Sequence, residues 1–191
     1  MWKNRPKRVF DVLLSTVGGF VFLGPFLALA LLTKLTSRGP VLYWSSRVGC
    51  NNVIFKMPKI RSMRVDTPAV ATHLLNKPEQ YLTPIGAFLR KSSLDELPQL
   101  WSILKGDMSF VGPRPALFNQ ADLIDLRTRQ GVHRLVPGLT GWAQVNGRDE
   151  LSIQDKVGLD AEYLRRQSLL FDVLIVTRTI IKVLLRDGVS H

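Results

Sequence analysis

The chain has 191 residues, of which 46% are hydrophobic, and a formal net charge of +11. This length and hydrophobic content are enough for one domain with a buried core and exclude an intrinsically disordered chain. The single cysteine, Cys50, excludes an intramolecular disulfide and a cysteine-cluster metal site, which suits a reducing compartment. The charge is uneven, because residues 1–64 carry +10 and residues 65–191 only +1.

An apolar segment follows the basic N-terminus. Residues 12–32 carry no charge and would reach about 31 Å as a straight helix, enough to cross a hydrocarbon core. A cleaved signal peptide is a weaker alternative, because the segment is too long and no small-x-small cleavage site stands before Lys34. Residues 1–38 are therefore predicted to be a basic flank and a membrane helix, and residues 39–191 a separate domain.

The residues leave open whether this helix spans the membrane or re-enters it. Gly24 and Pro25 lie just past its middle, and Pro25 removes a backbone hydrogen bond, which bends helices. Lys and Arg flank both ends, and cytoplasmic flanks collect these residues, which favours both ends on one side. Proline kinks also occur in spanning helices, so the local pattern favours a re-entrant helix and a spanning helix about equally.

A short β-hairpin is predicted next. Residues 41–44 and 53–55 are rich in β-branched and aromatic side chains and flank a turn-like Gly-Cys-Asn-Asn sequence. In residues 56–64, Lys59 and Arg61 alternate with apolar residues and would share a face of an extended chain. They belong either to an anion-facing strand or to a solvated edge strand whose lysines discourage pairing.

The densest charge and turn signals lie in residues 82–115, centred on Asp95 and Glu96. Ser93 and Glu96 have the spacing of a helix capping box, in which the acids would only complement the helix dipole. Pro98 argues against this interpretation, because a helix that starts at Ser93 would need its backbone N–H. Pro98 suits the first helical position better, which places both acids at the mouth of a helix N-terminus.

The rest of the chain is predicted to contain two helices and a loop. A moderately amphipathic helix is expected over residues 116–130, and a glycine-rich loop over residues 135–148, where Arg148 could bind a nucleotide or only close the loop. The last helix, residues 169–186, is either an interfacial helix in a lipid headgroup layer or a core helix with a snorkelling basic face. Its basic stripe consists of Arg178, Lys182 and Arg186.

Several stretches occur in the order known from one protein family: KRVFD before the apolar segment, KIRSM at 59–63, LRKSSLDELPQLWSILKGDMSFVGPRP at 89–115, PGLTGWAQVNGR at 137–148 and LDAEYLRRQSLLFD at 159–172. In these stretches the chain resembles the bacterial sugar transferases, small monotopic phosphoglycosyl transferases that start glycan assembly on a polyprenyl phosphate. It departs from them at Ile60 and Ser62, where the family has KFRTM, and at Gly24, where Ser-Pro is often found.

The resemblance implies an α+β fold. The expected molecule is a mostly helical monotopic membrane protein with an N-terminal re-entrant membrane helix, a short β-hairpin and amphipathic interfacial helices. Residues 39–191 would be its catalytic domain on the cytoplasmic face of the bacterial inner membrane. The implied partners are a UDP-sugar, polyprenyl phosphate and the inner leaflet of the membrane, and a homo-oligomer is left open.

The resemblance also implies a division of roles among the site residues. Asp95 would attack the β-phosphate of the UDP-sugar, release UMP and hold a phosphosugar until polyprenyl phosphate accepts it. Glu96 would bind Mg²⁺, which commonly takes one or two carboxylates together with substrate phosphates. The remaining candidates are substrate-binding residues, chosen mainly because guanidinium groups suit phosphate: Arg90, Arg114 and Arg148, with Lys59 and Arg61 as weaker candidates, and Asp172, an acid of the last motif without a defined role.

The alternative function is a membrane-tethered, basic nucleic-acid-binding or adaptor protein without catalysis. Its basic face would continue through the folded domain, whereas residues 65–191 are nearly neutral. We therefore expect an enzyme and no nucleic-acid partner. Salt-dependent binding to nucleic acid would support the adaptor, and Mg²⁺-dependent release of UMP would support the enzyme.

Overall fold

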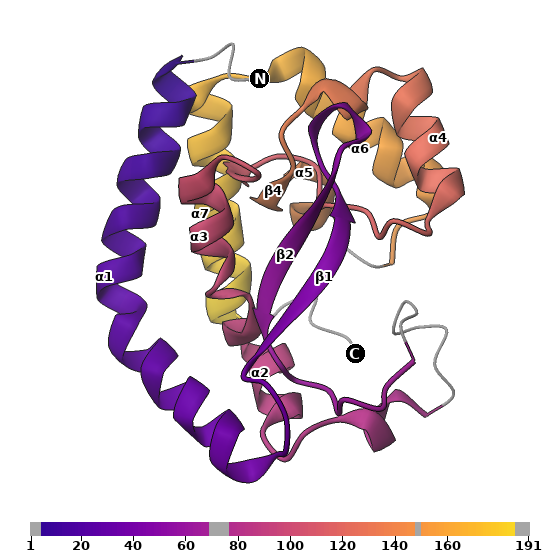
Figure 1. The fold of residues 1–191 in the computed structure, drawn as a ribbon. Coiled ribbons are helices and arrows are strands. Elements are labelled where there is room, and N and C mark those ends of the chain that lie inside the picture. The colour runs from indigo at the N-terminus through magenta and orange to yellow at the C-terminus, as the bar shows by residue number, and fades with distance from the viewer. Residues whose placement is uncertain (1–4, 69–76, 148–149, 186–191) are drawn as a thin grey trace.

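The computed structural model describes residues 5–68, 77–147 and 150–185. One long helix lies along one side of the molecule, and a two-stranded hairpin crosses a body built mostly of shorter helices (Figure 1). The described strands form only two small sheets, each with two strands. The prediction of a mostly helical α+β fold is confirmed.

Helix α1, Arg5–Thr36, is continuous through Pro25 and follows a curved path along the body (Figure 1). By its 32 residues it is about 48 Å long. In the part of the chain that the structure describes, it is the one helix long and apolar enough to cross a membrane. Apolar side chains stay exposed along its middle, as at Phe20 and Leu27, so this surface has no cover within the described chain.

Strand β1, Leu42–Val48, pairs antiparallel with strand β2, Ile54–Ile60, so the predicted hairpin is confirmed. The reversal runs through Cys50–Asn52, where Asn51 and Asn52 both have positive φ, a conformation that asparagine tolerates well. The strands are longer than the sequence predicted, because Lys56 and Lys59 belong to β2 and not to a separate edge strand.

Two short helices enclose the acidic pair. Helix α2, Gly86–Ser92, ends at Ser93, whose φ of 57° reverses the chain into a short 3₁₀ helix, Leu94–Glu96. Helix α3, Gln99–Lys105, follows with Pro98 at its N-cap. The capping-box interpretation is wrong, because the Ser93 side chain makes no capping hydrogen bond. The alternative, acids at the mouth of a helix that starts near Pro98, is confirmed.

Strand β3, Ser109–Val111, pairs in parallel with β4, Gly138–Thr140. The two backbones meet so closely that a Cβ at Gly138 would lie 2.1 Å from the Gly112 nitrogen, which explains a glycine at that place in PGLTG. Helix α4, Ala121–Arg129, lies between these strands in the chain and is shorter than the predicted helix.

Three helices complete the body. The predicted loop contains β4 and a short helix α5, Trp142–Val145, and α6, Ile153–Arg166, was not predicted. Helix α7, Leu169–Leu185, agrees with the predicted last helix. The largest core cluster joins β3, α5, α6 and α7, and a second cluster holds β2 against α3 through Met57, Ile103 and Met108. This second cluster fixes the hairpin beside the acidic pair.

Candidate active site

The acidic pair lies between the hairpin and the segment that follows β3. The Nζ of Lys59, on β2, is 2.8 Å from Glu96 Oε1 and 3.5 Å from Asp95 Oδ2. Arg114 Nη2 donates to the same Glu96 oxygen at 3.0 Å. Asp95 is only 6% exposed. Two carboxylates and two cations from three separate segments therefore meet at one point.

The two carboxylates have opposite electrostatic environments. Burial raises the pKa of Asp95, and the charge of Glu96 adds to this effect, while Lys59 opposes it. Burial also acts to raise the pKa of Glu96, but Arg114 and Lys59 outweigh it, so the pKa lies well below its usual value. Glu96 therefore stays ionised, and Asp95 is the more basic carboxylate of the pair.

Arg114 is held from behind by a buried ion pair. Arg127, on α4, donates through Nη1 to the backbone oxygen of Arg114 at 2.8 Å. Asp160, on α6, binds the Nε and Nη2 groups of Arg127 at 2.9 and 2.6 Å. The sequence analysis missed both residues, because a buried arginine on one helix and its acid on another share no local pattern.

Arg47, on β1, is a further residue that the sequence analysis missed. It donates to the Pro115 oxygen at 3.1 Å and to Ser45 Oγ at 3.0 Å. Burial, and next the charge of Arg114, lower its pKa to about 10, although Glu96 opposes this. Arg47 and Arg127 thus fix both sides of the segment that presents Arg114.

The structure places two of the other candidates away from the acidic pair. Arg61 donates to the oxygens of Pro40 and Ser37, where the chain leaves α1. Asp172 is 1% exposed, and its two oxygens accept hydrogen bonds from Lys7 at 2.6 Å and from Tyr163 at 2.7 Å. Both oxygens of Asp172 are engaged in linking α1, α6 and α7.

The last two candidates are less informative. Arg90, in the last turn of α2, lies with Nη1 at 3.5 Å from Met63 Sδ. Arg148 lies outside the described residues. Of the predicted basic residues, the structure therefore brings Lys59 and Arg114 into direct contact with the acidic pair.

The donor set at this site suits Mg²⁺. In the described ranges, no group of three or more His, Cys, Asp or Glu side chains forms a complete metal site. Asp95 and Glu96 supply two carboxylates, which is the share that proteins commonly give to Mg²⁺ when substrate phosphates and water provide the rest. The site therefore fits a metal that arrives with a phosphorylated substrate.

A buried carboxylate pair faced by two cations has the chemistry of a site for phosphorylated groups, and α1 is long and apolar enough to cross a membrane. The family model for bacterial sugar transferases matches residues 2–186. The chain belongs to the bacterial sugar transferase family, which confirms the resemblance drawn from its motifs and its class as a transferase.

Curated relatives match most of the chain. The exopolysaccharide production protein ExoY of Rhizobium meliloti (strain 1021) is 37% identical over 95% of this chain and 87% of its own length. The undecaprenyl-phosphate glucose phosphotransferase of Komagataeibacter xylinus is 41% identical over 94% of this chain. The UDP-glucose:undecaprenyl-phosphate glucose-1-phosphate transferase of Escherichia coli (strain K12) is 39% identical over 92%. The chain spans only 36% and 39% of the last two proteins.

Proposed function

We propose that this chain transfers a sugar 1-phosphate from a UDP-sugar to polyprenyl (undecaprenyl) phosphate, giving a polyprenyl diphosphosugar and UMP. The observation that carries the proposal is the Asp95–Glu96 pair, buried and faced by Lys59 and Arg114. The relatives from Komagataeibacter xylinus and Escherichia coli, both named for transfer of glucose phosphate to undecaprenyl phosphate, support this substrate class. The reaction would be the first membrane step of a glycan such as an exopolysaccharide, O-antigen or capsule.

The two carboxylates have different roles in the proposed reaction, in line with their different electrostatic environments. An Asp95 oxygen forms a bond to the β-phosphorus of the UDP-sugar, the bond from that phosphorus to the bridging oxygen breaks, and UMP leaves with this oxygen. The phosphate oxygen of the lipid then attacks the same phosphorus and releases the Asp95 carboxylate. The raised pKa of Asp95 makes its ionised form a stronger nucleophile than an ordinary aspartate.

The cations would bind the phosphates that the reaction brings together. Lys59 and Arg114 lie at the carboxylates and match the need for fixed positive charge where phosphate charge develops. Glu96 would hold Mg²⁺, which when bound would neutralise charge on the diphosphate. Arg127 and Arg47 keep the Arg114 segment in place, so Arg114 needs little reorganisation when a substrate binds.

The packing of α1 supports a re-entrant arrangement of this helix, which we place at the cytoplasmic face of the inner membrane as part of the proposal. Lys7 and Arg8, near the start of α1, bond to Asp172 and to the Ile103 and Leu104 oxygens. Near its end, Leu29 packs with Ile60 and Leu89. Both ends thus contact one folded body, whereas a spanning helix would place about 30 Å of hydrocarbon between them.

Covalent capture tests the proposal directly. Purified protein incubated with a radiolabelled UDP-sugar and Mg²⁺, without lipid, should retain the sugar phosphate and release UMP. Asp95→Asn should abolish both the retained label and turnover, because an amide cannot form an acyl phosphate. Glu96→Gln should shift the Mg²⁺ dependence to higher concentration, because an amide is a poor ligand for a hard cation.

Asp125→Asn is the matched control, since Asp125 is an exposed carboxylate on α4 that pairs only with Arg129 among the described residues. It should label like the unchanged protein. A labelled Asp95→Asn protein would show that another group is the nucleophile. Turnover without labelling would show direct transfer between the two substrates.

A further inference from the structure

A second basic site lies where the chain leaves α1. A pocket of about 580 Å³ is lined there by residues 37–39, Arg61 and residues 64–66. Three of these residues are arginines and one, Asp66, is an acid, which pairs with Arg64 at 3.1 Å. Within the described chain, no carboxylate lies within ion-pair distance of Arg38 or Arg61. The pocket thus has a local excess of positive charge.

Arg61 is the most informative residue of this pocket. It is 5% exposed, and its Nε and Nη2 groups donate only to neutral oxygens, those of Pro40 at 2.6 Å and of Ser37 at 2.9 and 3.1 Å. Its Nη1 is buried without a hydrogen-bond partner in the described structure. A buried guanidinium charge that meets only neutral acceptors is unfavourable, and an anion would satisfy both the charge and the remaining donors.

Gly39 keeps space beside this guanidinium. Its φ is +119°, and a Cβ there would lie 2.7 Å from Val65 Cγ2, 3.5 Å from Arg61 Cζ and 3.6 Å from Arg61 Nη1. A side chain at residue 39 would therefore fill the space between the pocket and the Arg61 guanidinium. The backbone at this position is compatible with an anion that approaches Arg61 over Gly39.

The surroundings of the pocket indicate what carries the anion. Leu31, Leu32 and Leu35, on the last turns of α1, have large exposed fractions, as has Val65 at the pocket itself. An apolar surface that passes directly into clustered arginines matches the order of groups in a bilayer, in which acyl chains meet phosphates. A free phosphate would use the arginines and leave the apolar border without a role.

We propose that this pocket binds the phosphate group of a phospholipid headgroup, with Arg61 at its floor and Arg38 and Arg64 at its rim. Guanidinium groups suit a phosphate because they offer paired N–H donors. A lipid bound there would hold the C-terminal end of α1 at headgroup depth. The site is distinct from the acidic pair, since no hydrogen bond or ion pair that the structure describes joins these arginines to Asp95 or Glu96. The proposal does not depend on the transfer reaction.

Native mass spectrometry of the full chain in detergent tests the site. Four probes are titrated separately: dioleoylphosphatidylglycerol, dioleoylglycerol with the same chains and no phosphate, inorganic phosphate, and undecaprenyl phosphate. We expect one retained phosphatidylglycerol at a concentration at which dioleoylglycerol and inorganic phosphate do not bind. Arg38→Gln/Arg64→Gln should weaken this binding about tenfold to a hundredfold, since each lost charged hydrogen bond is worth roughly a factor of ten.

The matched control is Arg129→Gln/Arg165→Gln, which removes two exposed guanidinium groups from α4 and α6, at the other end of the molecule (Figure 1). It should leave lipid retention unchanged. Arg61→Lys keeps the positive charge but loses the paired N–H donors of the guanidinium group. It should weaken lipid retention, and circular dichroism should show that the fold is intact. Equal retention by the arginine pair variant and its control would overturn the proposal. Binding of inorganic phosphate as tight as the binding of phosphatidylglycerol would overturn the lipid assignment. Retention of undecaprenyl phosphate without retention of phosphatidylglycerol would overturn it as well.

Discussion

At the scale of single residues, Asp95 and Glu96 are neighbours with opposite effects on stability. The pKa of Asp95 is raised, chiefly by burial, so ionising it favours the unfolded chain, and its contribution to stability falls as the pH rises through the folded-state pKa. The pKa of Glu96 is lowered because Arg114 and Lys59 outweigh burial, so its contribution is present above the usual glutamate pKa and is lost at lower pH.

This difference predicts opposite stability changes for two similar substitutions. At pH 7, Asp95→Asn should leave the free energy of unfolding unchanged or raise it, because it removes a buried charge. Glu96→Gln should lower it by roughly 1–3 kcal/mol, because Lys59 and Arg114 lose their shared partner, an effect that their partial exposure moderates. Thermal unfolding in detergent between pH 5 and pH 8 measures both changes.

Asp125→Asn again serves as the control and should change little at any of these pH values, because its ion pair with Arg129 is exposed. The difference between Asp95→Asn and the unchanged protein should shrink as the pH falls toward the usual aspartate pKa. Equal destabilisation by Asp95→Asn and Glu96→Gln would contradict the assignment of opposite environments.

At the scale of elements, local sequence signals predicted the helices and strands whose formation depends on neighbouring residues in the chain. The hairpin, the helix that begins near Pro98 and the last helix all follow from turn residues, capping and apolar spacing, and all three are present. Helix α6 was missed although Ser152 caps it, accepting a hydrogen bond from the Asp155 backbone N–H, because its motif was interpreted for chemistry only.

Only part of the candidate active site could be predicted from the sequence, and the reason is physical. Adjacent acids stand out in a sequence, and Lys59 and Arg114 lie in motifs that the family resemblance marks. Arg47 is placed by the pairing of two strands, and Asp160 acts on Arg114 only through Arg127, 33 residues away in the chain. Such relays depend on tertiary packing, which no local pattern records.

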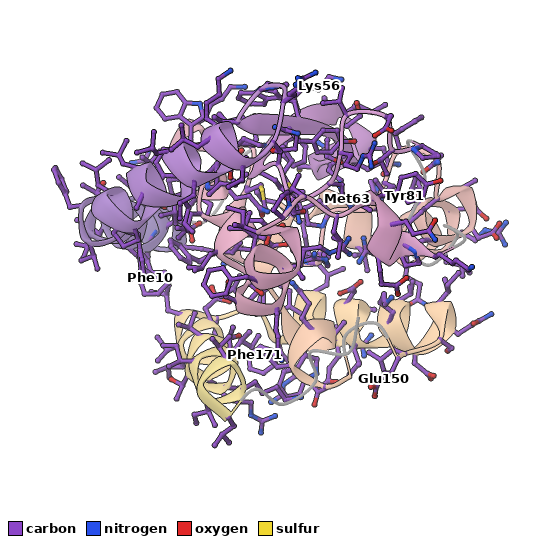
Figure 2. The ribbon with its side chains drawn as sticks, turned by 90° about the horizontal axis from the view of Figure 1, so that it is seen from below. Phe10, Lys56, Met63, Tyr81, Glu150 and Phe171 are labelled. Atoms are coloured by element: carbon purple, nitrogen blue, oxygen red, sulfur yellow. The ribbon has the colours of Figure 1, made fainter. Side chains whose placement is uncertain are left out.

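A buried ion pair joins the first turns of helices α1 and α7, and its loss should be costly. Figure 2 shows both helices on one side of the molecule, with Phe171 at the start of α7. Asp172→Asn should lower the free energy of unfolding by about 3–5 kcal/mol, because the buried Lys7 ammonium loses its ion-pair partner at 2.6 Å. Thermal unfolding and proteolysis of α1 measure this loss.

Two further variants separate the ion pair from a general loss of packing. Lys7→Met/Asp172→Leu should recover part of the stability, because both charges of the ion pair are then removed, although the buried Asp11 also loses the nearby Lys7 charge. Lys105→Met is the matched control, since its ion pair with Asp107 is largely exposed at the lysine and should contribute at most about 1 kcal/mol. An Asp172→Asn protein of normal stability that has lost substrate affinity would instead favour a role in substrate binding.

At the scale of the whole molecule, the structure predicts the topology of α1. Both ends of the helix contact the same body, so cysteines at residues 4 and 36, introduced one at a time with Cys50→Ser, should both resist an impermeant maleimide outside intact cells. Both should react after lysis. Labelling of residue 4 alone in intact cells would show a spanning helix.

Pro25→Leu should increase labelling at residue 4, because it restores a backbone donor inside α1 and raises the helix propensity there. Ala28→Leu is the matched control, since Ala28 is exposed on the same helix and the change adds apolar volume without altering the backbone. If both variants label alike, apolar content and not the proline decides the topology.

The ion pair between Lys7 and Asp172 joins residues 165 positions apart, which has a consequence for synthesis. At roughly 5–20 residues per second, a ribosome needs about 8–33 s to reach Asp172 after it has made Lys7. During that interval the nascent α1 has no α7 to receive it. In the membrane arrangement that we propose, we therefore expect the bilayer and the basic flanks to set the orientation of α1 early, before the ion pair between Lys7 and Asp172 can form.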